Sequence, residues 1–271
     1  MKYLQNLHTH SSYCDGLDTP ERMILVAAEK GFQSIGFSGH SYMYYAPSHS
    51  MTAAGTELYR QEIRYLKQKY GHMMDIFCGL EVDMYSNIDL SGYDYLIGSV
   101  HYLKLEGKLV GIDRSAEVVQ DVITRYFYRN SLSYVKAYYR TLAQLPKYGN
   151  FDIIGHYDLI TKHIERQFLF DHTSKEYRRL AIEAAEALAG KIPYFEVNTG
   201  AIARGFRTTP YPDKFILKEM KRLGFGVVIS SDCHDARFVD CYFDQAKDLL
   251  KECGFKEQYV LKKEGFVPIE L

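Results

Sequence analysis

The sequence predicts an α/β barrel of about seven parallel strands, because strand-like and helix-like runs alternate along the whole chain. Short runs rich in β-branched and aromatic residues are followed by longer runs of helical periodicity. No linker, repeat or low-complexity segment interrupts this alternation over 271 residues. One closed barrel is therefore favoured over two domains, and an open doubly wound sheet is the alternative. We expect residues 1–271 to form a single barrel domain.

The individual elements follow one another in a regular order. The first strand is expected at residues 2–7, directly before a pair of histidines. The helix at residues 17–31 has clear ends, because Thr19 is a good N-cap, Pro20 fits the first helical position and Gly31 is a typical stop. Further strands are expected at residues 33–40, 74–83, 94–103, 151–158, 194–200 and 226–234. Further helices are expected at residues 56–71, 116–129, 132–147, 174–190, 213–224 and 244–254.

Composition and charge favour a soluble protein that acts on small molecules. The chain is 46% hydrophobic and has a net charge of −1, so it has no overall positive field for a nucleic-acid backbone. No stretch approaches the roughly 20 apolar residues of a membrane span, and the N-terminus lacks the apolar run of a signal peptide. The five cysteines show no CxxC spacing, which favours reduced thiols. We therefore expect a cytoplasmic protein without a nucleic-acid or membrane partner; no oligomeric state is indicated.

Metal-binding side chains follow nearly every predicted strand. His8 and His10 are separated by one residue, as are Asp232 and His234, so each pair shares one face of an extended chain. Parallel strands place their carboxyl ends on one face of a barrel, where these side chains should meet. Independent structural histidines, the alternative, would also fall on helices and strand starts. The candidate ligands are His8, His10, Asp15, His40, Glu81, His101, His156, Asp232 and His234.

Six imidazoles and three carboxylates are too many ligands for one metal ion. A tetrahedral ion takes about four ligands, so the set suits two to three divalent transition metal ions. Imidazole with carboxylate suits zinc, iron or manganese. Such a cluster converts water to hydroxide near neutral pH and stabilises a tetrahedral oxyanion, which predicts a hydrolase. Asp15 is the weakest candidate, because Asp before Gly is also a common turn pair.

In order, these residues resemble the motifs of the PHP (polymerase and histidinol phosphatase) superfamily of metal-dependent phosphoesterases. The motifs are HTH at His8 to His10, SGHS around His40, GLEVD around Glu81, GSVHYL around His101, DIIGHYDLI around His156 and SSDCH at Asp232 to His234. The match covers almost the whole chain. Length, the absence of fused domains and the segment EVNTGAIARGFRTTPYP make the chain most similar to the stand-alone histidinol-phosphate phosphatases.

The resemblance implies a distorted seven-stranded β/α barrel with a trinuclear metal centre. It also implies hydrolysis of L-histidinol phosphate to L-histidinol and phosphate in histidine biosynthesis, by a metal-activated hydroxide, with Glu81, Asp232 and His234 as catalytic residues. By matching position, one ion would be held by His8, His10, Glu81 and Asp232, a second by Glu81, His101 and His156, and the third by Asp15, His40 and His234.

Basic residues near two strand ends are candidates for holding the phosphate. Arg204 and Arg207 follow the strand at residues 194–200, and guanidinium groups match phosphate oxygens well. Lys162 follows the strand at residues 151–158. The alternative is that all of these side chains are simply solvated. The tyrosine-rich loop at residues 42–50 either contacts an imidazole-bearing substrate or only packs against itself.

Other activities remain as alternatives to be tested. Another phosphoesterase of the superfamily would act on nucleotides or other small phosphate esters. An amidohydrolase also begins with HxH, but it usually needs a bridging lysine on strand four, where this chain has His101. A barrel that only binds metal would lack some ligands, and none is missing from the pattern.

Overall fold

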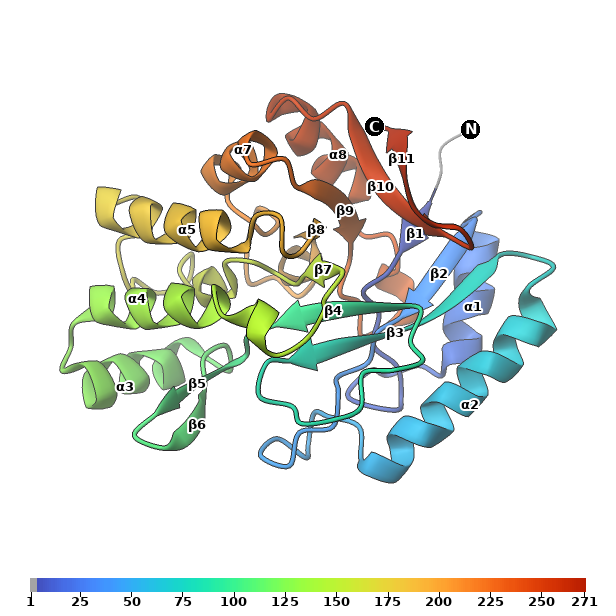
Figure 1. The fold of residues 1–271 in the computed structure, drawn as a ribbon, viewed down its shortest axis with the longest axis horizontal. Helices are drawn as coiled ribbons and strands as arrows, with labels where there is room; N and C mark the ends of the chain where they lie inside the picture. Colours follow the sequence, from blue (N-terminus) through green and yellow to red (C-terminus); the bar gives the residue numbers. More distant parts are fainter. Residues whose placement is uncertain (1–3) are drawn as a thin grey trace.

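Parallel strands form a nearly closed barrel with helices around its outside (Figure 1). The computed structural model describes residues 4–271. The seven-stranded sheet has the order β1-β2-β3-β4-β7-β8-β9, and every neighbouring pair is parallel. Its strands are β1 (Gln5–Asn6), β2 (Ser34–Phe37), β3 (Asp75–Asp83), β4 (Tyr95–Ser99), β7 (Ile153–Ile154), β8 (Tyr194–Asn198) and β9 (Gly226–Ser230).

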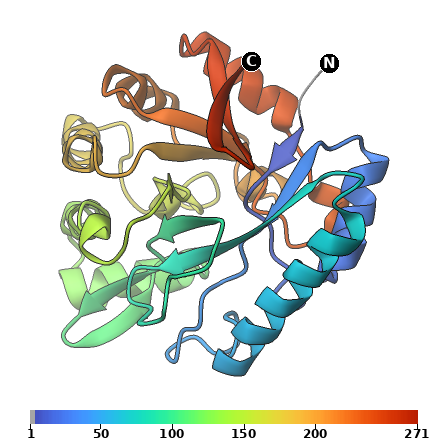
Figure 2. The ribbon, with the colours of Figure 1, turned by 45° about the vertical axis from the view of Figure 1, so that its right-hand side comes forward.

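The first and last strands of this sheet approach each other just beyond their carboxyl ends. Thr9 and Cys233 form a parallel bridge, and the backbone N–H of His10 donates to the carbonyl of Cys233 at 2.9 Å. Figure 2 shows the strands arranged around a common centre with the helices outside them. The predicted barrel is therefore confirmed, and the open doubly wound sheet is not the fold.

Helices connect the strands on the outer surface of the barrel. They are α1 (Pro20–Glu29), α2 (Ala53–Tyr70), α3 (Ala116–Phe127), α4 (Ser131–Leu142), α5 (Lys175–Leu188), α7 (Lys214–Arg222) and α8 (Phe243–Glu252). Thr19 caps α1 as predicted, because its side chain accepts a hydrogen bond from the backbone N–H of Arg22. The predicted helix at residues 132–147 is too long. Pro146 has no N–H to extend an α-helix, so the chain forms a 3₁₀ turn at Leu145–Lys147 instead.

Two hairpins have no counterpart in the sequence prediction. The predicted strand at residues 94–103 divides, since β4 ends at Ser99 and a hairpin of β5 (Tyr102–Leu105) and β6 (Lys108–Gly111) follows. A second hairpin of β10 (Glu257–Lys262) and β11 (Gly265–Glu270) ends the chain. For the predicted first strand, β1 occupies only Gln5–Asn6, and residues 2 and 3 lie outside the described residues.

The C-terminal hairpin closes the end of the barrel opposite the site. The side chain of Gln5 donates to the carbonyl of Leu261 and accepts from its backbone N–H, each at 2.7 Å. Leu261 also joins the apolar interior, which is formed by Leu7, Phe77, Tyr95, Ile97, Ile153, Val228 and Leu261. Each such side chain contributes about 1.5 to 3 kcal/mol when fully buried. The apolar interior of the barrel is therefore tightly packed and lies beneath the carboxyl ends of the strands.

Gly79 gives one reason why the apolar interior of the barrel is tightly packed. A Cβ atom at this position in β3 would overlap the ring of Tyr95, which is 1% exposed and fills the middle of the barrel. A glycine here lets the backbone approach the ring closely. Among residues 4–271, no helix is both long and apolar enough to span a bilayer.

Candidate metal centre

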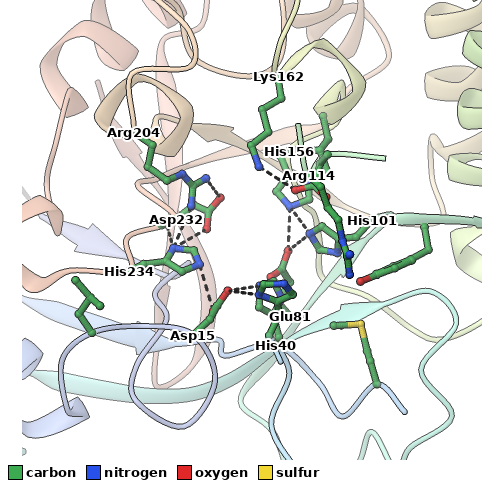
Figure 3. A pocket seen from close by; sticks show the side chains of 16 residues that line it. Asp15, His40, Glu81, His101, Arg114, His156, Lys162, Arg204, Asp232 and His234 are labelled. Carbon is green, nitrogen blue, oxygen red and sulfur yellow. Dashed lines mark hydrogen bonds and ion pairs between the residues drawn. The ribbon is translucent and has the colours of Figure 1, made fainter. Parts of the chain in front are cut away.

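The structure brings the nine expected ligands together at the carboxyl end of the barrel. Every strand of the sheet except β8 has one or more of them at or next to this end. His8 and His10 are fully buried, and the other candidate ligands line a pocket of about 630 Å³ above them (Figure 3). The expectation that parallel strands would gather these side chains on one face is thereby met in geometry.

Glu81 lies at the centre of the cluster. Its Oε1 is 2.9 Å from His156 Nε2 and 3.3 Å from His101 Nε2. Its Oε2 is 2.8 Å from His40 Nδ1 and 3.3 Å from His8 Nε2. The side chain is 1% exposed, so water does not compete for these contacts. One carboxylate thus faces two groups of imidazoles, the arrangement that a bridging ligand requires.

His8 and His10 meet Asp232 at the bottom of the pocket. Asp232 Oδ1 is 3.2 Å from His10 Nε2 and 3.7 Å from His8 Nε2. Thr9, between the two histidines, points away and donates its hydroxyl to the carbonyl of Gly36 at 2.8 Å. Asp232 has a φ of 47°, a left-handed conformation that costs energy in most residues. Backbone strain is therefore located where this carboxylate meets the imidazoles.

Asp15 brings the third predicted group of ligands together. Its Oδ1 is 3.3 Å from His234 Nε2, and its Oδ2 is 3.8 Å from His40 Nε2. The turn that carries it folds back tightly, because a Cβ atom at Gly16 would lie only 2.5 Å from the carbonyl carbon of His10. The Asp-Gly pair is thus a turn, and the same turn directs the Asp15 carboxylate into the cluster.

The pKa values of His10, Glu81 and Asp232 shift in directions that suit metal binding. Burial and the neighbouring histidines lower the pKa of His10 to about 3, so its imidazole is neutral at pH 7. Burial by itself raises the pKa of Glu81, but the histidines that face it outweigh burial and hold the pKa well below its usual value. Burial likewise raises the pKa of Asp232, and Arg204 together with the histidines lowers it well below the usual range. Neutral imidazole and ionised carboxylate are the forms that bind metals. For His8, His40 and His101, burial lowers the pKa, but the carboxylates that face them outweigh burial and raise it.

Unpartnered buried atoms in the cluster test whether these residues fit metal ions. Nε2 of His8 and Nε2 of His10 are buried without a hydrogen-bond partner, although such atoms are nearly always satisfied in proteins. Three groups of donor atoms each fit within 4.8 Å: His10, Asp15, His40 and His234; His8, His10 and Asp232; and His40, Glu81 and His101. The donors therefore fit bound ions, and their chemistry suits zinc, iron or manganese.

Cationic side chains stand at the rim of the pocket, as Figure 3 shows for Arg204 and Lys162. Arg204 follows the short helix α6 (Gly200–Ala203); its Nη2 donates to Asp232 Oδ2 at 3.1 Å and its Nη1 lies 3.1 Å from His234 Nδ1. Lys162 Nζ donates to Asp113 Oδ2 at 2.9 Å. Arg204 is thus held against two predicted ligands, and Lys162 lines the same pocket through its ion pair with Asp113.

Arg207, the other predicted phosphate-binding arginine, is not brought to the pocket. Its guanidinium donates to the hydroxyls of Thr161 and Thr209 and lies over the ring of Tyr211, 4.7 Å from the centroid. The nearest oxygen of the buried Asp158 is 4.0 Å away. A turn with Gly205 at a φ of 69° lies between the two arginines, so Arg204 reaches the pocket while Arg207 packs inside the loop. The structure gives no support for phosphate binding by Arg207.

Several residues in or behind the pocket were not predicted from the sequence. His49, Asp113 and Arg114 line it from loops, where polar residues carry no distinctive signal. Behind the predicted ligands lie two further carboxylates, Asp83 in β3 and Glu196 in β8, each 1% exposed. A signal for Glu196 exists in the sequence, because it is the one carboxylate in an otherwise apolar strand.

Asp83 and the tyrosine-rich loop support His101. Asp83 Oδ2 accepts from the backbone N–H of His101 at 3.0 Å and lies 3.5 Å from its Nδ1. Tyr45 donates its hydroxyl to Asp83 Oδ1 at 2.6 Å. Tyr45 therefore packs behind a predicted ligand, while Met43 of the same loop lines the pocket.

The fold and the site together define a metal-binding barrel hydrolase, with its candidate metal ligands at the carboxyl face. The chain belongs to the PHP family, because the PHP domain matches residues 6–200. It is 26% identical over 283 residues to the "Probable histidinol-phosphatase" of Schizosaccharomyces pombe, covering 94% of this chain and 89% of that protein. It is 25% identical over 265 residues to the protein of the same name from Deinococcus radiodurans, covering 94% and 95%.

A solved structure shares the same fold. The histidinol phosphate phosphatase of Lactococcus lactis, crystallised with zinc, L-histidinol and phosphate, is 23% identical and has a TM-score of 0.72. The match covers 97% of this chain and 98% of that chain. The fold of nearly the whole chain is therefore shared with that protein.

Proposed function

We propose that this chain is a metal-dependent phosphomonoesterase that hydrolyses L-histidinol phosphate to L-histidinol and phosphate, a step of histidine biosynthesis. The observation that carries the proposal is the convergence of six imidazoles and three carboxylates beneath a pocket with cationic residues at its rim. The relatives named histidinol-phosphatase support the choice of substrate. So does the L-histidinol and phosphate in the Lactococcus lactis structure.

The nine ligand candidates would hold two to three divalent ions in the groups predicted from the sequence. Bound there, divalent transition metal ions supply positive charge that neutralises the phosphate and activates water for attack at phosphorus. Glu81 would be shared between ions, because its two oxygens face different imidazoles. Asp232 and His234 would act both as ligands and as the anchor for Arg204.

Arg204 would orient the phosphate. Only part of its guanidinium faces Asp232 and His234, so other N–H groups remain for phosphate oxygens. Charge-assisted hydrogen bonds of this kind are stronger than neutral ones and fix the direction of the in-line attack. Contacts that hold Arg204 before substrate arrives reduce the entropy lost on binding.

The rest of the pocket matches an amino alcohol that carries an imidazole ring. Met43, Tyr102 and Leu159 provide an apolar wall against which a flat ring can pack. Asp113 and Lys162 form an ion pair at the rim, which offers a carboxylate to an ammonium group and a cation to phosphate. Nucleotides and other small phosphate esters are the alternative substrates, and these contacts do not favour them.

A phosphate-release assay on purified protein tests the proposal. With L-histidinol phosphate, kcat/KM should exceed the values for nucleoside monophosphates and p-nitrophenyl phosphate by at least about a hundredfold, roughly 2.7 kcal/mol. Comparable values for all three substrates would instead identify a general phosphoesterase and would contradict the assigned specificity.

A further inference from the structure

Strand β8 is the strand of the barrel that contributes none of the nine expected ligands, yet it directs a carboxylate at them from behind. Glu196, in the middle of β8, is 1% exposed and is flanked by the buried Phe195 and Val197. Burying a charged group without partners is costly. The contacts of Glu196 therefore indicate what it does in this position.

Both oxygens of Glu196 are surrounded by donors. Oε2 lies 2.9 Å from His8 Nδ1 and accepts from the hydroxyl of Ser230. Oε1 accepts from the backbone N–H of His156 at 2.6 Å and from Asn198 Nδ2 at 2.8 Å. An ionised carboxylate accepts about four hydrogen bonds and donates none, so these contacts fill its capacity. His8 must therefore carry its proton on Nδ1 when its imidazole is neutral.

This arrangement leaves Nε2 of His8 as the ring atom with a free lone pair. Nε2 lies 3.3 Å from Glu81 Oε2 and 3.7 Å from Asp232 Oδ1, and it is buried without a hydrogen-bond partner. In metal sites, a carboxylate behind a histidine commonly fixes the tautomer and the ring direction in this way.

The same carboxylate reaches two further parts of the cluster. Its bond to the backbone N–H of His156 fixes the chain just after β7, where that predicted ligand begins. Asn198 links Glu196 to Asp232, since its Nδ2 also lies 3.3 Å from Asp232 Oδ2. The amide is held in this orientation because its Oδ1 accepts from the backbone N–H of Gly200 at 2.9 Å.

We propose that Glu196 is a positioning residue of the metal centre, which sets the Nδ1–H tautomer of His8 and aligns His8 with His156 and Asp232. The proposal rests on the metal binding proposed above and assigns to β8 a role that its lack of ligands leaves open. Glu196 itself would not contact a metal ion.

Glu196→Gln separates this role from simple packing, because it keeps the shape and removes one acceptor. If the amide nitrogen of Glu196→Gln pointed toward His156 and Asn198, it would face two other donors, and the backbone N–H of His156 cannot turn away. With the nitrogen toward His8 and Ser230, the hydroxyl can rotate and His8 must accept on Nδ1. The second orientation moves the His8 proton to Nε2, the atom that faces the ions.

The test compares zinc binding and the His8 ring signal in three proteins. Zinc affinity is measured by competition with a chelating dye, and Glu196→Gln should lower it about 10- to 100-fold. The matched control is Ser230→Ala, which removes a partner of the same oxygen without placing a donor against His8; its zinc affinity should stay near that of the unchanged chain. Metal-free thermal unfolding of each variant checks the fold.

In zinc-loaded, ¹⁵N-histidine-labelled protein, the unchanged chain and Ser230→Ala should show a slowly exchanging Nδ1–H on His8, which Glu196→Gln should lose. Unchanged zinc affinity in Glu196→Gln, or His8 in the unchanged protein without an Nδ1–H, would overturn the proposal. The absence of an Nδ1–H on His8 in the unchanged protein would overturn the proposal even if Glu196→Gln fails to fold. A chain that binds no zinc at all would instead contradict the proposed metal site, so the two failures are distinguishable.

Discussion

Arg204 and Arg207 are only three positions apart, and their replacement by Ala should have opposite consequences. The Arg204 side chain is 34% exposed and lines the pocket, whereas the Arg207 side chain is 4% exposed and contacts Thr161, Thr209 and Tyr211. Arg204→Ala should therefore impair catalysis with little effect on stability. Arg207→Ala should impair stability with little effect on catalysis.

The magnitudes follow from the contacts of each guanidinium. Arg204 would supply charge-assisted hydrogen bonds to phosphate worth about 1.5 to 3 kcal/mol, so Arg204→Ala should lower kcat/KM roughly 10- to 150-fold. Loss of Arg207 leaves the fully buried Asp158 without its cation. Breaking a buried pair costs about 3 to 5 kcal/mol, and the lower end applies because Asp158 can take up a proton. Burial already raises the pKa of Asp158 to about 6.

The assay measures kcat/KM for L-histidinol phosphate, bound metal and the melting temperature of both variants. A loss of about 3 kcal/mol in Arg207→Ala corresponds to a melting temperature lower by roughly 6 to 12 °C. Bound metal should be unchanged in Arg204→Ala. The reasoning is refuted if Arg204→Ala keeps the kcat/KM of the unchanged chain. It is also refuted if Arg207→Ala, assayed well below its melting temperature, loses kcat/KM as strongly as Arg204→Ala should.

Three other changes test separate parts of the site and the barrel. Glu81→Gln should lose bound metal and lower kcat/KM by more than about a hundredfold, because the neutral amide weakens charge-assisted contacts on both sides of the side chain. The control is Glu183→Gln on the exposed face of α5, which should keep both the bound metal and kcat/KM. Chelation should lower the melting temperature, because ions that bind only the folded chain stabilise it by about 2.7 kcal/mol when their free concentration is a hundred times Kd. An unchanged melting temperature would argue against bound ions. Gly79→Ala should destabilise the barrel by about 1 to 3 kcal/mol in denaturant unfolding, because its Cβ would overlap Tyr95, and no loss would contradict the close packing described.

The barrel and the position of the ligand candidates could be predicted because both depend on strand order alone. Strands that alternate with helices run parallel, so residues that follow them, such as His40, His101 and His156, must gather at one end. The i, i+2 spacing of His8 and His10 fixed their common direction, with Thr9 pointing away. These inferences need no knowledge of loop conformation.

The features that sequence analysis missed depend on loop geometry or on contacts between distant residues. Arg204 and Arg207 belong to the same loop, and only the turn between them, where Gly205 has a φ of 69°, decides which one reaches the pocket. The role of Leu261 at the bottom of the barrel depends on its pairing with Gln5, far away in sequence. Glu196 carries a signal, a charge inside an apolar strand, but its partners His8 and His156 come from other strands.

The central claim is that a cluster of ions held by this pocket hydrolyses L-histidinol phosphate. The most direct test is to remove metal by chelation and to follow phosphate release from L-histidinol phosphate while zinc, iron(II) or manganese(II) is titrated back. We predict no release from the metal-free protein and a rate that saturates near two to three equivalents of the active ion. Full activity without metal, or saturation at one equivalent, would contradict it.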